Sequence, residues 1–183
     1  KLCEDMADLL LNERVQITIS GSEATSEYVH QVLEDNKFLV KGNDYQERKA
    51  CSGTVAYVVQ IKDAVADEAG NVTGGTIRMN YVQAKNVFPI SWENGEITEA
   101  AFLFPKTVER KKYALIQIHR LKPVENVMQY VIENHVVQCT QGAGTEIPPE
   151  KWKDLKPFSG ISAEIKTGSD RPQFVIDRLN IVN

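Results

Sequence analysis

The sequence predicts an α+β fold in which N-terminal helices are followed by a mainly antiparallel β-sheet. Apolar residues first recur at helical spacing, within the first 53 residues. From residue 54 to residue 139 they instead alternate with polar residues, as in strands that bury one face. Short turns separate these alternating segments. This arrangement favours a meander of consecutive strands, which can be partly closed.

Three helices are expected before residue 53. Between Leu2 and Leu11, apolar side chains recur at i, i+4, i+7 and i+8, so they share one helix face. A second helix begins at Ser22 or Thr25, either of which can cap its first amides, and Asn36 is suited to a left-handed stop. A third helix, from about Leu39 to Cys51, is weaker because a glycine and an asparagine interrupt it.

Two alternating segments predict the first strands. The segment from Val15 to Ile19 predicts one strand between the first two helices. After Gly53, residues 55–61 and 77–81 alternate again and predict a hairpin. The loop between them, from Asp63 to Gly75, is polar and rich in glycine, so the hairpin is expected to have a long, mobile tip.

Residues 86–102, NVFPISWENGEITEAAF, predict the next hairpin. Asn94 and Gly95 both accept a positive φ, as the tight turn between two strands requires. Proline before the turn indicates a strand edge or a bulge. Val87, Phe88 and Phe102 are therefore expected in the core. Three later strands complete the meander, at Ile97–Phe104, Lys112–Leu121 and Val127–Cys139.

The whole chain is interpreted as a single α+β domain over residues 1–183. Residues 1–53 are mostly helical with one strand, residues 54–139 form antiparallel strands, and residues 140–183 form a loop-rich closing segment. This last segment is expected to contain a loop over TQGAGTEIPP, a short helix from Pro149 to Leu155 and a strand from Gln173 to Ile176.

Composition narrows the class of protein. The 183 residues, 42% hydrophobic and 25% charged, lie near the globular average and favour neither a disordered chain nor a membrane protein. No apolar run approaches the ~18 residues of a membrane span, so a soluble chain is expected. The net charge of −4 argues against a surface built mainly to bind phosphates. The missing initiator Met suggests a piece of a longer protein.

The three cysteines predict reduced thiols. Cys3, Cys51 and Cys139 are odd in number and include no C-x-x-C pair, whereas a disulfide framework usually has an even number at close spacing. The cysteines and histidines lie tens of residues apart and offer no chelating pair. We therefore expect no metal ligand and no cofactor-binding residue.

Nucleophilic catalysis has one set of candidate residues. Cys51 could act as a nucleophile with His30, His119 or His135 as its base, but no pair of these stands in a known local arrangement. Cys51 ends a predicted helix and precedes a core strand, which favours the role of a small buried apolar residue. We therefore expect no catalytic residue among these candidates.

Four residues are candidate contacts for a partner: Trp92, Trp152, Lys151 and Lys153. Trp92 lies beside the Asn-Gly turn. The lysines around Trp152 either cover the indole ring with their aliphatic stems or form a contact patch with it. The compact basic run at residues 110–112 is interpreted as a charged hairpin turn that protects a sheet edge, in preference to a nucleic-acid contact.

Five segments, in order, resemble the portal proteins of tailed bacteriophages, of the siphovirus type. They are KLCEDMADLLLNE, EYVHQVLEDNKF, YVQAKNVFPISWENGEITEAAF, KKYALIQIHRLK and RPQFVIDRLNIVN. In that family a helix ending in LLLNE precedes a strand, and a strand reaching FPISW.NG.ITEA.F precedes a K.Y strand. The likeness covers nearly the whole chain, although the loop Asp63 to Gly75 is longer than in typical members.

The resemblance implies a non-enzymatic structural protein of the virion. Portal subunits form a ring, typically of twelve copies, at one capsid vertex, and DNA passes through the ring during packaging and ejection. Implied partners are other copies of the chain, the terminase packaging motor, scaffold and capsid proteins, and head-tail connector proteins, with no membrane and no cofactor. Assembly would take place in the bacterial host cytoplasm. This chain would contribute the outer wing, with the stem and clip after residue 183.

Two alternatives stay open. One is an enzyme of unknown class that uses Cys51 and a histidine. The other is a small β-rich binding module, for which specific DNA binding is disfavoured by the negative charge.

Overall fold

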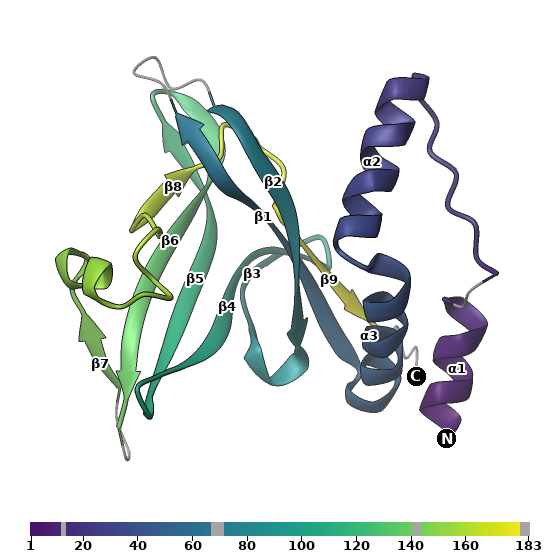
Figure 1. The fold of residues 1–183 in the computed structure, drawn as a ribbon, viewed down its shortest axis with the longest axis horizontal. Helices are drawn as coiled ribbons and strands as arrows, with labels where there is room; N and C mark the ends of the chain where they lie inside the picture. Colours follow the sequence, from purple (N-terminus) through teal and green to yellow (C-terminus); the bar gives the residue numbers. More distant parts are fainter. Residues whose placement is uncertain (12–13, 67–71, 141–143, 180–183) are drawn as a thin grey trace. The chain divides into compact units, whose positions relative to one another are not determined.

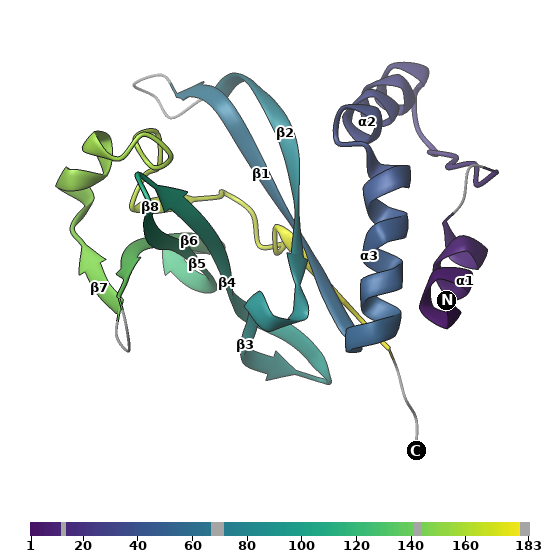
Figure 2. The ribbon, with the colours of Figure 1, turned by 60° about the horizontal axis from the view of Figure 1, so that its bottom comes forward.

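The computed structural model describes residues 1–11, 14–66, 72–140 and 144–179, and confirms the α+β fold class (Figures 1 and 2). The chain forms two compact units rather than the single domain suggested by the sequence. Unit 1 comprises Lys1–Ala84 and Gln173–Asn183, and unit 2 comprises Lys85–Pro172. The first boundary falls at a three-residue 3-10 turn, η1 (Ala84–Asn86), which joins two strands and so carries no linker composition.

Unit 1 combines three helices with a three-stranded antiparallel sheet. The helices are α1 (Leu2–Leu10), α2 (Glu23–Asp35) and α3 (Phe38–Ser52). The sheet has the strand order β2-β1-β9, in which β1 is Thr54–Ala66, β2 is Val72–Gln83 and β9 is Phe174–Arg178. The last strand of the chain thus returns to unit 1 and pairs with β1, as Tyr57 opposite Val175 illustrates.

The predicted first hairpin is confirmed, but its loop is shorter than expected. Tyr57 lies opposite Tyr81, and pairing continues outward to Ala66 opposite Val72. Residues 67–71 of the predicted tip lie outside the described residues. Polar and glycine residues near the tip suggested a loop, whereas the ladder extends through most of them because backbone hydrogen bonds do not depend on side-chain polarity.

Helix α3 is anchored on this sheet by aromatic and polar side chains. The rings of Tyr45, Tyr57 and Tyr81 contact one another, with centroids 5.0 to 6.4 Å apart. The Tyr45 hydroxyl donates to the carbonyl oxygen of Tyr81 at 2.6 Å. Burial raises the pKa of Tyr81 to about 12. At the edge strand β9, the Lys49 ammonium lies 2.7 Å from the Asp177 carboxylate.

The corner between α2 and α3 differs from the predicted left-handed stop at Asn36. Asn36 has a φ of −89°, and the left-handed residue is Lys37, with a φ of 52°. The Asn36 side chain is buried and bridges two elements. Its amide nitrogen donates to the carbonyl oxygens of Val32 and Ile77, and its amide oxygen accepts from the backbone N–H of Met79. Asn36 therefore ties the end of α2 to the outer edge of β2.

The predicted strand at Val15–Ile19 is wrong. These residues are extended but belong to no strand. Their side chains nevertheless alternate between partly buried and exposed positions, with Val15, Ile17 and Ile19 facing inward. Alternation reports that one side of an extended chain is buried, and it occurs equally where that side packs on helices instead of joining a sheet.

Unit 2 is a six-stranded antiparallel sheet with the strand order β3-β4-β5-β6-β7, and β8 also pairs with β6. The order is that of an open sheet, with β3 at one edge and β7 and β8 beyond β6 at the other. The predicted meander is confirmed, while β7 and β8 lie where a loop-rich segment was expected. The bounds are β3 Val87–Glu93, β4 Glu96–Val108, β5 Lys111–Val124, β6 Val127–Cys139, β7 Gly144–Ile147 and β8 Glu164–Lys166.

The core of unit 2 corrects the sequence analysis at β3. Phe102 is fully buried, as expected, and Val87 is partly buried. Phe88, however, is 49% exposed, so its placement in the core was wrong. The reason is topological: β3 is an edge strand, and its pairing with β4 is irregular between Pro89 and Trp92. The predicted bulge at the proline is thus confirmed.

Two-residue turns join β3 to β4 and β4 to β5, and their residues differ in how well they tolerate a positive φ. The Asn94-Gly95 turn is confirmed, with φ values of 50° and 83°. Between β4 and β5, Glu109 and Arg110 adopt the same conformation, with φ values of 47° and 68°. A left-handed residue other than glycine costs roughly 1–2 kcal/mol, and asparagine tolerates this conformation best. The β4–β5 turn therefore stores strain.

The double substitution Glu109→Asn with Arg110→Gly should raise the free energy of unfolding of unit 2 by about 1 kcal/mol, because it relieves this strain. Urea denaturation followed by tryptophan fluorescence measures the change. The matched control places the unfavourable pair in the other turn, as Asn94→Glu with Gly95→Arg. A Cβ on Gly95 would meet nothing within 4 Å, so the loss of stability expected there reflects backbone conformation alone. An unchanged stability in both variants would contradict the strain assignment.

Candidate functional site

The four predicted contact residues do not form one surface. Trp92 lies on β3, while Lys151, Trp152 and Lys153 lie on the 3-10 helix η2 (Pro149–Asp154), which follows β7. Because β3 and β7 are the opposite edges of the sheet, the two tryptophans belong to different regions of unit 2. Trp92 is 58% exposed, and both lysines are exposed.

Trp152 is a core residue. Only 2% of it is exposed, and its indole N–H donates to the carbonyl oxygen of Ile147 at 2.7 Å. The ring packs in a cluster with Tyr113, Leu115, Val136 and Phe158. Trp152 therefore secures η2 to the sheet, and its indole ring is not presented at the surface of unit 2. The sequence left two roles open for this segment: lysine stems that cover the indole, or a contact patch that includes it. The burial of Trp152 agrees with the first.

Helix α1 presents an apolar face to solvent. Ala7 is the buried residue of α1, whereas the large apolar side chains of this helix are exposed. Leu2 is 74% exposed and Leu9 is 82% exposed. Single exposed apolar residues are common, but several on one helix indicate a surface that meets another molecule. We call this surface the α1 apolar face and define it as Leu2, Met6, Leu9 and Leu10.

A second apolar surface lies on the edge strand β3. Its large apolar side chains Phe88, Ile90 and Trp92, which we call the β3 patch, are all exposed. An edge strand also presents unpaired backbone groups, and natural proteins usually protect such edges with charge, proline or irregular pairing. β3 carries Pro89 and an irregular ladder, which disfavour addition of a further strand. The patch is therefore suited to contact through side chains.

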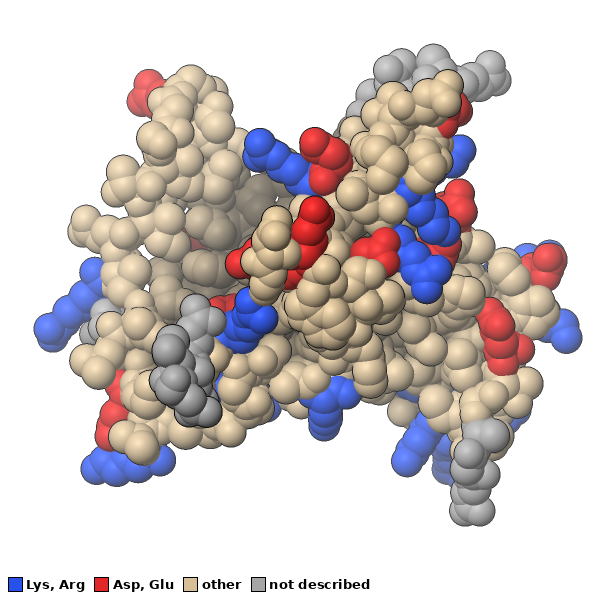
Figure 3. Space-filling view, turned by 180° about the vertical axis from the view of Figure 1, so that it is seen from behind, with Lys and Arg blue, Asp and Glu red and all other residues tan. Residues whose placement is uncertain are grey.

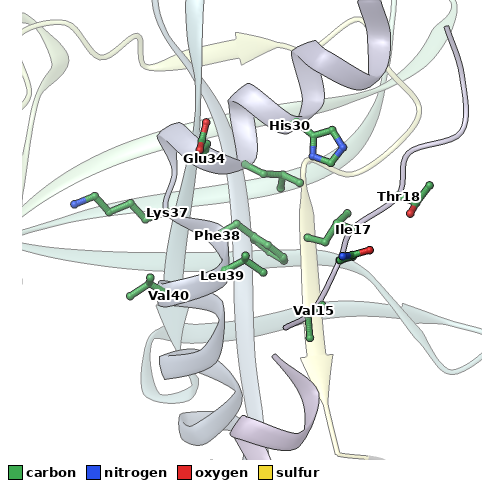
Figure 4. A pocket seen from close by; sticks show the side chains of 11 residues that line it. Val15, Ile17, Thr18, His30, Glu34, Lys37, Phe38, Leu39 and Val40 are labelled. Atoms are coloured by element: carbon green, nitrogen blue, oxygen red, sulfur yellow. The ribbon is translucent and has the colours of Figure 1, made fainter. Parts of the chain in front are cut away.

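Unit 1 contains a cavity of about 700 Å³ between the extended segment and the α2–α3 corner (Figure 4). Phe38 and Leu39 point from the corner toward Val15 and Ile17 on the extended segment. The volume of this cavity lies within the ~300–1,000 Å³ typical of small-molecule sites. Polar lining is contributed by Gln16, Thr18, His30, Glu34 and Lys37.

The residues considered as catalytic candidates, Cys51 and the three histidines, occupy unrelated environments. Cys51 is exposed in the last turn of α3, so its predicted role as a buried apolar residue is wrong. It lies two residues before the Gly53 cap. The neighbouring Cys3 thiol raises the pKa of Cys51. Among the residues that the structure describes, no three His, Cys, Asp or Glu side chains gather as a metal site.

The three histidines have distinct surroundings. His30 lines the cavity of unit 1. His135 reaches from β6 to Glu146 on β7, with Nδ1 2.7 Å from the carboxylate. His119 is fully buried in unit 2 and packs edge-on against Phe102, with ring centroids 5.3 Å apart. Burial lowers the pKa of His119 to about 4, so its imidazole is neutral at physiological pH.

Charged residues are interspersed with uncharged surface on the face shown in Figure 3. The basic run at residues 110–112 lies at the turn between β4 and β5, as predicted. Within the described ranges, none of the helices has both the length and the apolar character needed to cross a membrane.

Sequence reasoning missed the exposure of both apolar surfaces. The helical periodicity from Leu2 to Leu10 locates an apolar face but cannot say whether another part of the same chain covers it. At β3, Pro89 was the available sequence signal for an edge position, and it argued against a core assignment for Phe88. No protein-family model matches this chain, and a comparison with curated proteins also finds no match.

Proposed function

We propose that this chain is the outer wing of a phage portal subunit, which assembles into a ring at the capsid vertex and takes part in DNA packaging and ejection. The observation that supports an assembly role is the exposed α1 apolar face, with the β3 patch as a second surface. The order of the five portal-like segments supports the specific assembly. In this proposal the role is structural and needs no catalytic group or cofactor.

Burial of the α1 apolar face would contribute favourable free energy to assembly. Full burial of a leucine side chain contributes roughly 1.5–3 kcal/mol, and Leu2 and Leu9 are each about three-quarters exposed or more. A ring is built from head-to-tail contacts, in which one surface of a subunit meets a different surface of the next. Two separate apolar surfaces on one subunit fit this requirement, since each can serve a different neighbour.

The proposed partners follow from the portal assignment. Copies of the same chain form the ring, and terminase, scaffold, capsid and connector proteins dock on it in the virion. DNA passes through the channel without being bound specifically by this segment. The interspersed charges in Figure 3 accord with a surface that does not track a phosphate backbone.

The test compares assembly of the product of the complete reading frame with that of its Leu9→Ser variant. Because Leu9 is 82% exposed, the substitution should shift the free energy of unfolding by less than about 0.5 kcal/mol. Mass photometry should show at least a tenfold lower yield of rings from the variant. The matched control is Glu4→Gln, an exposed change on the same helix. Equal ring yields from all three proteins would contradict a role for the α1 apolar face.

A further inference from the structure

The pairing of α1 with α3 is fixed by contacts near the end of α1. Gly42 of α3 is buried, and the position of a Cβ atom on it would lie 3.1 Å from a methyl carbon of Leu11. The neighbouring Asn43 amide donates to the Asp8 carboxylate at 2.9 Å and to the carbonyl oxygen of Leu11. Figures 1 and 2 both show the two helices side by side.

The antiparallel register brings two cysteines together at the other end of the pair. Cys3 lies eight residues before Leu11, and Cys51 lies nine residues after Gly42. At a rise of 1.5 Å per residue these intervals are about 12 Å and about 13.5 Å, so the two positions are nearly level. The first cause of the raised pKa of Cys51 is the Cys3 thiol, which agrees with this register.

The two thiols differ in access to solvent. Cys51 is exposed, whereas Cys3 is partly buried. A reagent in solution can therefore reach Cys51 first, while Cys3 is held beside it as a second thiol. A second thiol at this position can resolve a mixed disulfide formed on Cys51.

We propose that Cys3 and Cys51 form a redox pair, and that oxidation by a small-molecule disulfide joins α1 covalently to α3. The Cys51 thiolate attacks one sulfur of glutathione disulfide, forms a mixed disulfide and releases one glutathione thiolate. The Cys3 thiolate then attacks the Cys51 sulfur and releases the second glutathione. Two protein thiols are oxidised, one glutathione disulfide is reduced to two glutathiones, and the two thiol protons pass to solvent or to the released thiolates.

The consequence for the molecule is a fixed position of α1. A crosslink between residues 3 and 51 closes a loop that contains α1, α2 and most of α3, and a closed loop of this length reduces the entropy of the unfolded chain. Oxidation should therefore raise the unfolding midpoint of unit 1. It also fixes the orientation of the α1 apolar face on α3.

The test uses the full chain with Cys139→Ser, so that Cys3 and Cys51 are the remaining thiols. The protein is incubated with glutathione disulfide and 0.1 mM reduced glutathione, then digested and analysed by mass spectrometry. A thiol held at short range has an effective concentration of roughly millimolar or more. The Cys3–Cys51 disulfide should therefore exceed the Cys51–glutathione mixed disulfide at least about tenfold.

The control variant adds Cys3→Ser, which retains the oxygen in place of the sulfur. It should accumulate the mixed disulfide on Cys51 and form no intrachain crosslink. The rate of oxidation of the pair should rise from pH 7 to pH 9, because the attacking species is the thiolate and the pKa of Cys51 is raised. Equal mixed-disulfide levels with and without Cys3, or crosslinks only between chains, would overturn the proposal.

Discussion

Asn36→Ala lowers the free energy of unfolding of unit 1 by about 3 kcal/mol. The substitution removes three hydrogen bonds, to Val32, Ile77 and Met79. It also leaves a carbonyl and an amide on the edge of β2 without the partner that the asparagine amide supplies. A buried polar group without a partner costs ~1–3 kcal/mol, and two of them account for the estimate.

The measurement is urea denaturation followed by the helical circular dichroism signal, because α1, α2 and α3 all belong to unit 1. The matched control is Gln31→Ala on the same helix, which removes an exposed hydrogen bond to Asp35 and should cost less than about 0.5 kcal/mol. Asn36→Asp should cost at least as much as Asn36→Ala, because a carboxylate would face two carbonyl oxygens. Equal effects at positions 36 and 31 would contradict the bridging role.

Unit 2 loses about 3 kcal/mol of stability as the pH falls from 6.5 to 4, through His119. The ordinary pKa of histidine is about 6.5, and burial lowers the pKa of His119 to about 4 in the folded protein. Between these two pH values the histidine is protonated in the unfolded state and neutral in the folded state. The free energy of unfolding therefore decreases as the pH falls. The full contribution of His119 to the stability of unit 2 is present above about pH 6.5. The difference of about 2.5 pKa units corresponds to roughly 3 kcal/mol.

Tryptophan fluorescence reports this loss selectively, because Trp92 and Trp152 both lie in unit 2. Urea midpoints at pH 7, 6 and 5 should fall for the natural chain and stay nearly level for His119→Gln. His30→Gln, at an exposed position in unit 1, is the control and should keep the pH dependence. Carboxylates contribute below about pH 5 in all three proteins, so the comparison rests on the difference between them. An unchanged pH dependence in His119→Gln would contradict the assignment.

The sequence predicted the order of elements well, because periodicity and turn chemistry are local. The Asn94-Gly95 turn, the Ser22 cap and the pairing of β1 with β2 were all confirmed. In contrast, Glu109 and Arg110 carry no turn signal, and the strands on either side extend further toward them than predicted. The ladder imposes the left-handed conformation on these two residues against their intrinsic preference.

Other errors came from questions that only tertiary structure decides. Asn36 has the right residue type for a helix end, yet its side chain is used to bridge α2 and β2 and the left-handed position passes to Lys37. The apolar character of Phe88 suggested the core, but its strand lies at a sheet edge. Neither the partner of an asparagine amide nor the neighbour of a strand is encoded in local spacing.

For the candidate surfaces too, local sequence pattern predicted part of the result and tertiary structure decided the rest. Periodicity predicted the apolar face of α1, and the structure adds that Leu2 and Leu9 remain exposed on it. Trp92 was correctly singled out as a residue beside a turn, and it is exposed, whereas Trp152 is buried with its flanking lysines at the surface. The proximity of Cys3 and Cys51 could not be predicted, since it depends on how α1 lies along α3.

The central claim, that this chain is the wing of a ring-forming portal subunit, is tested most directly by electron microscopy of the product of the complete reading frame. The proposal predicts closed rings of uniform size with a central channel, and with density for this α+β segment at the outer rim. Single subunits at micromolar concentration, or rings in which this segment lines the channel, would contradict it.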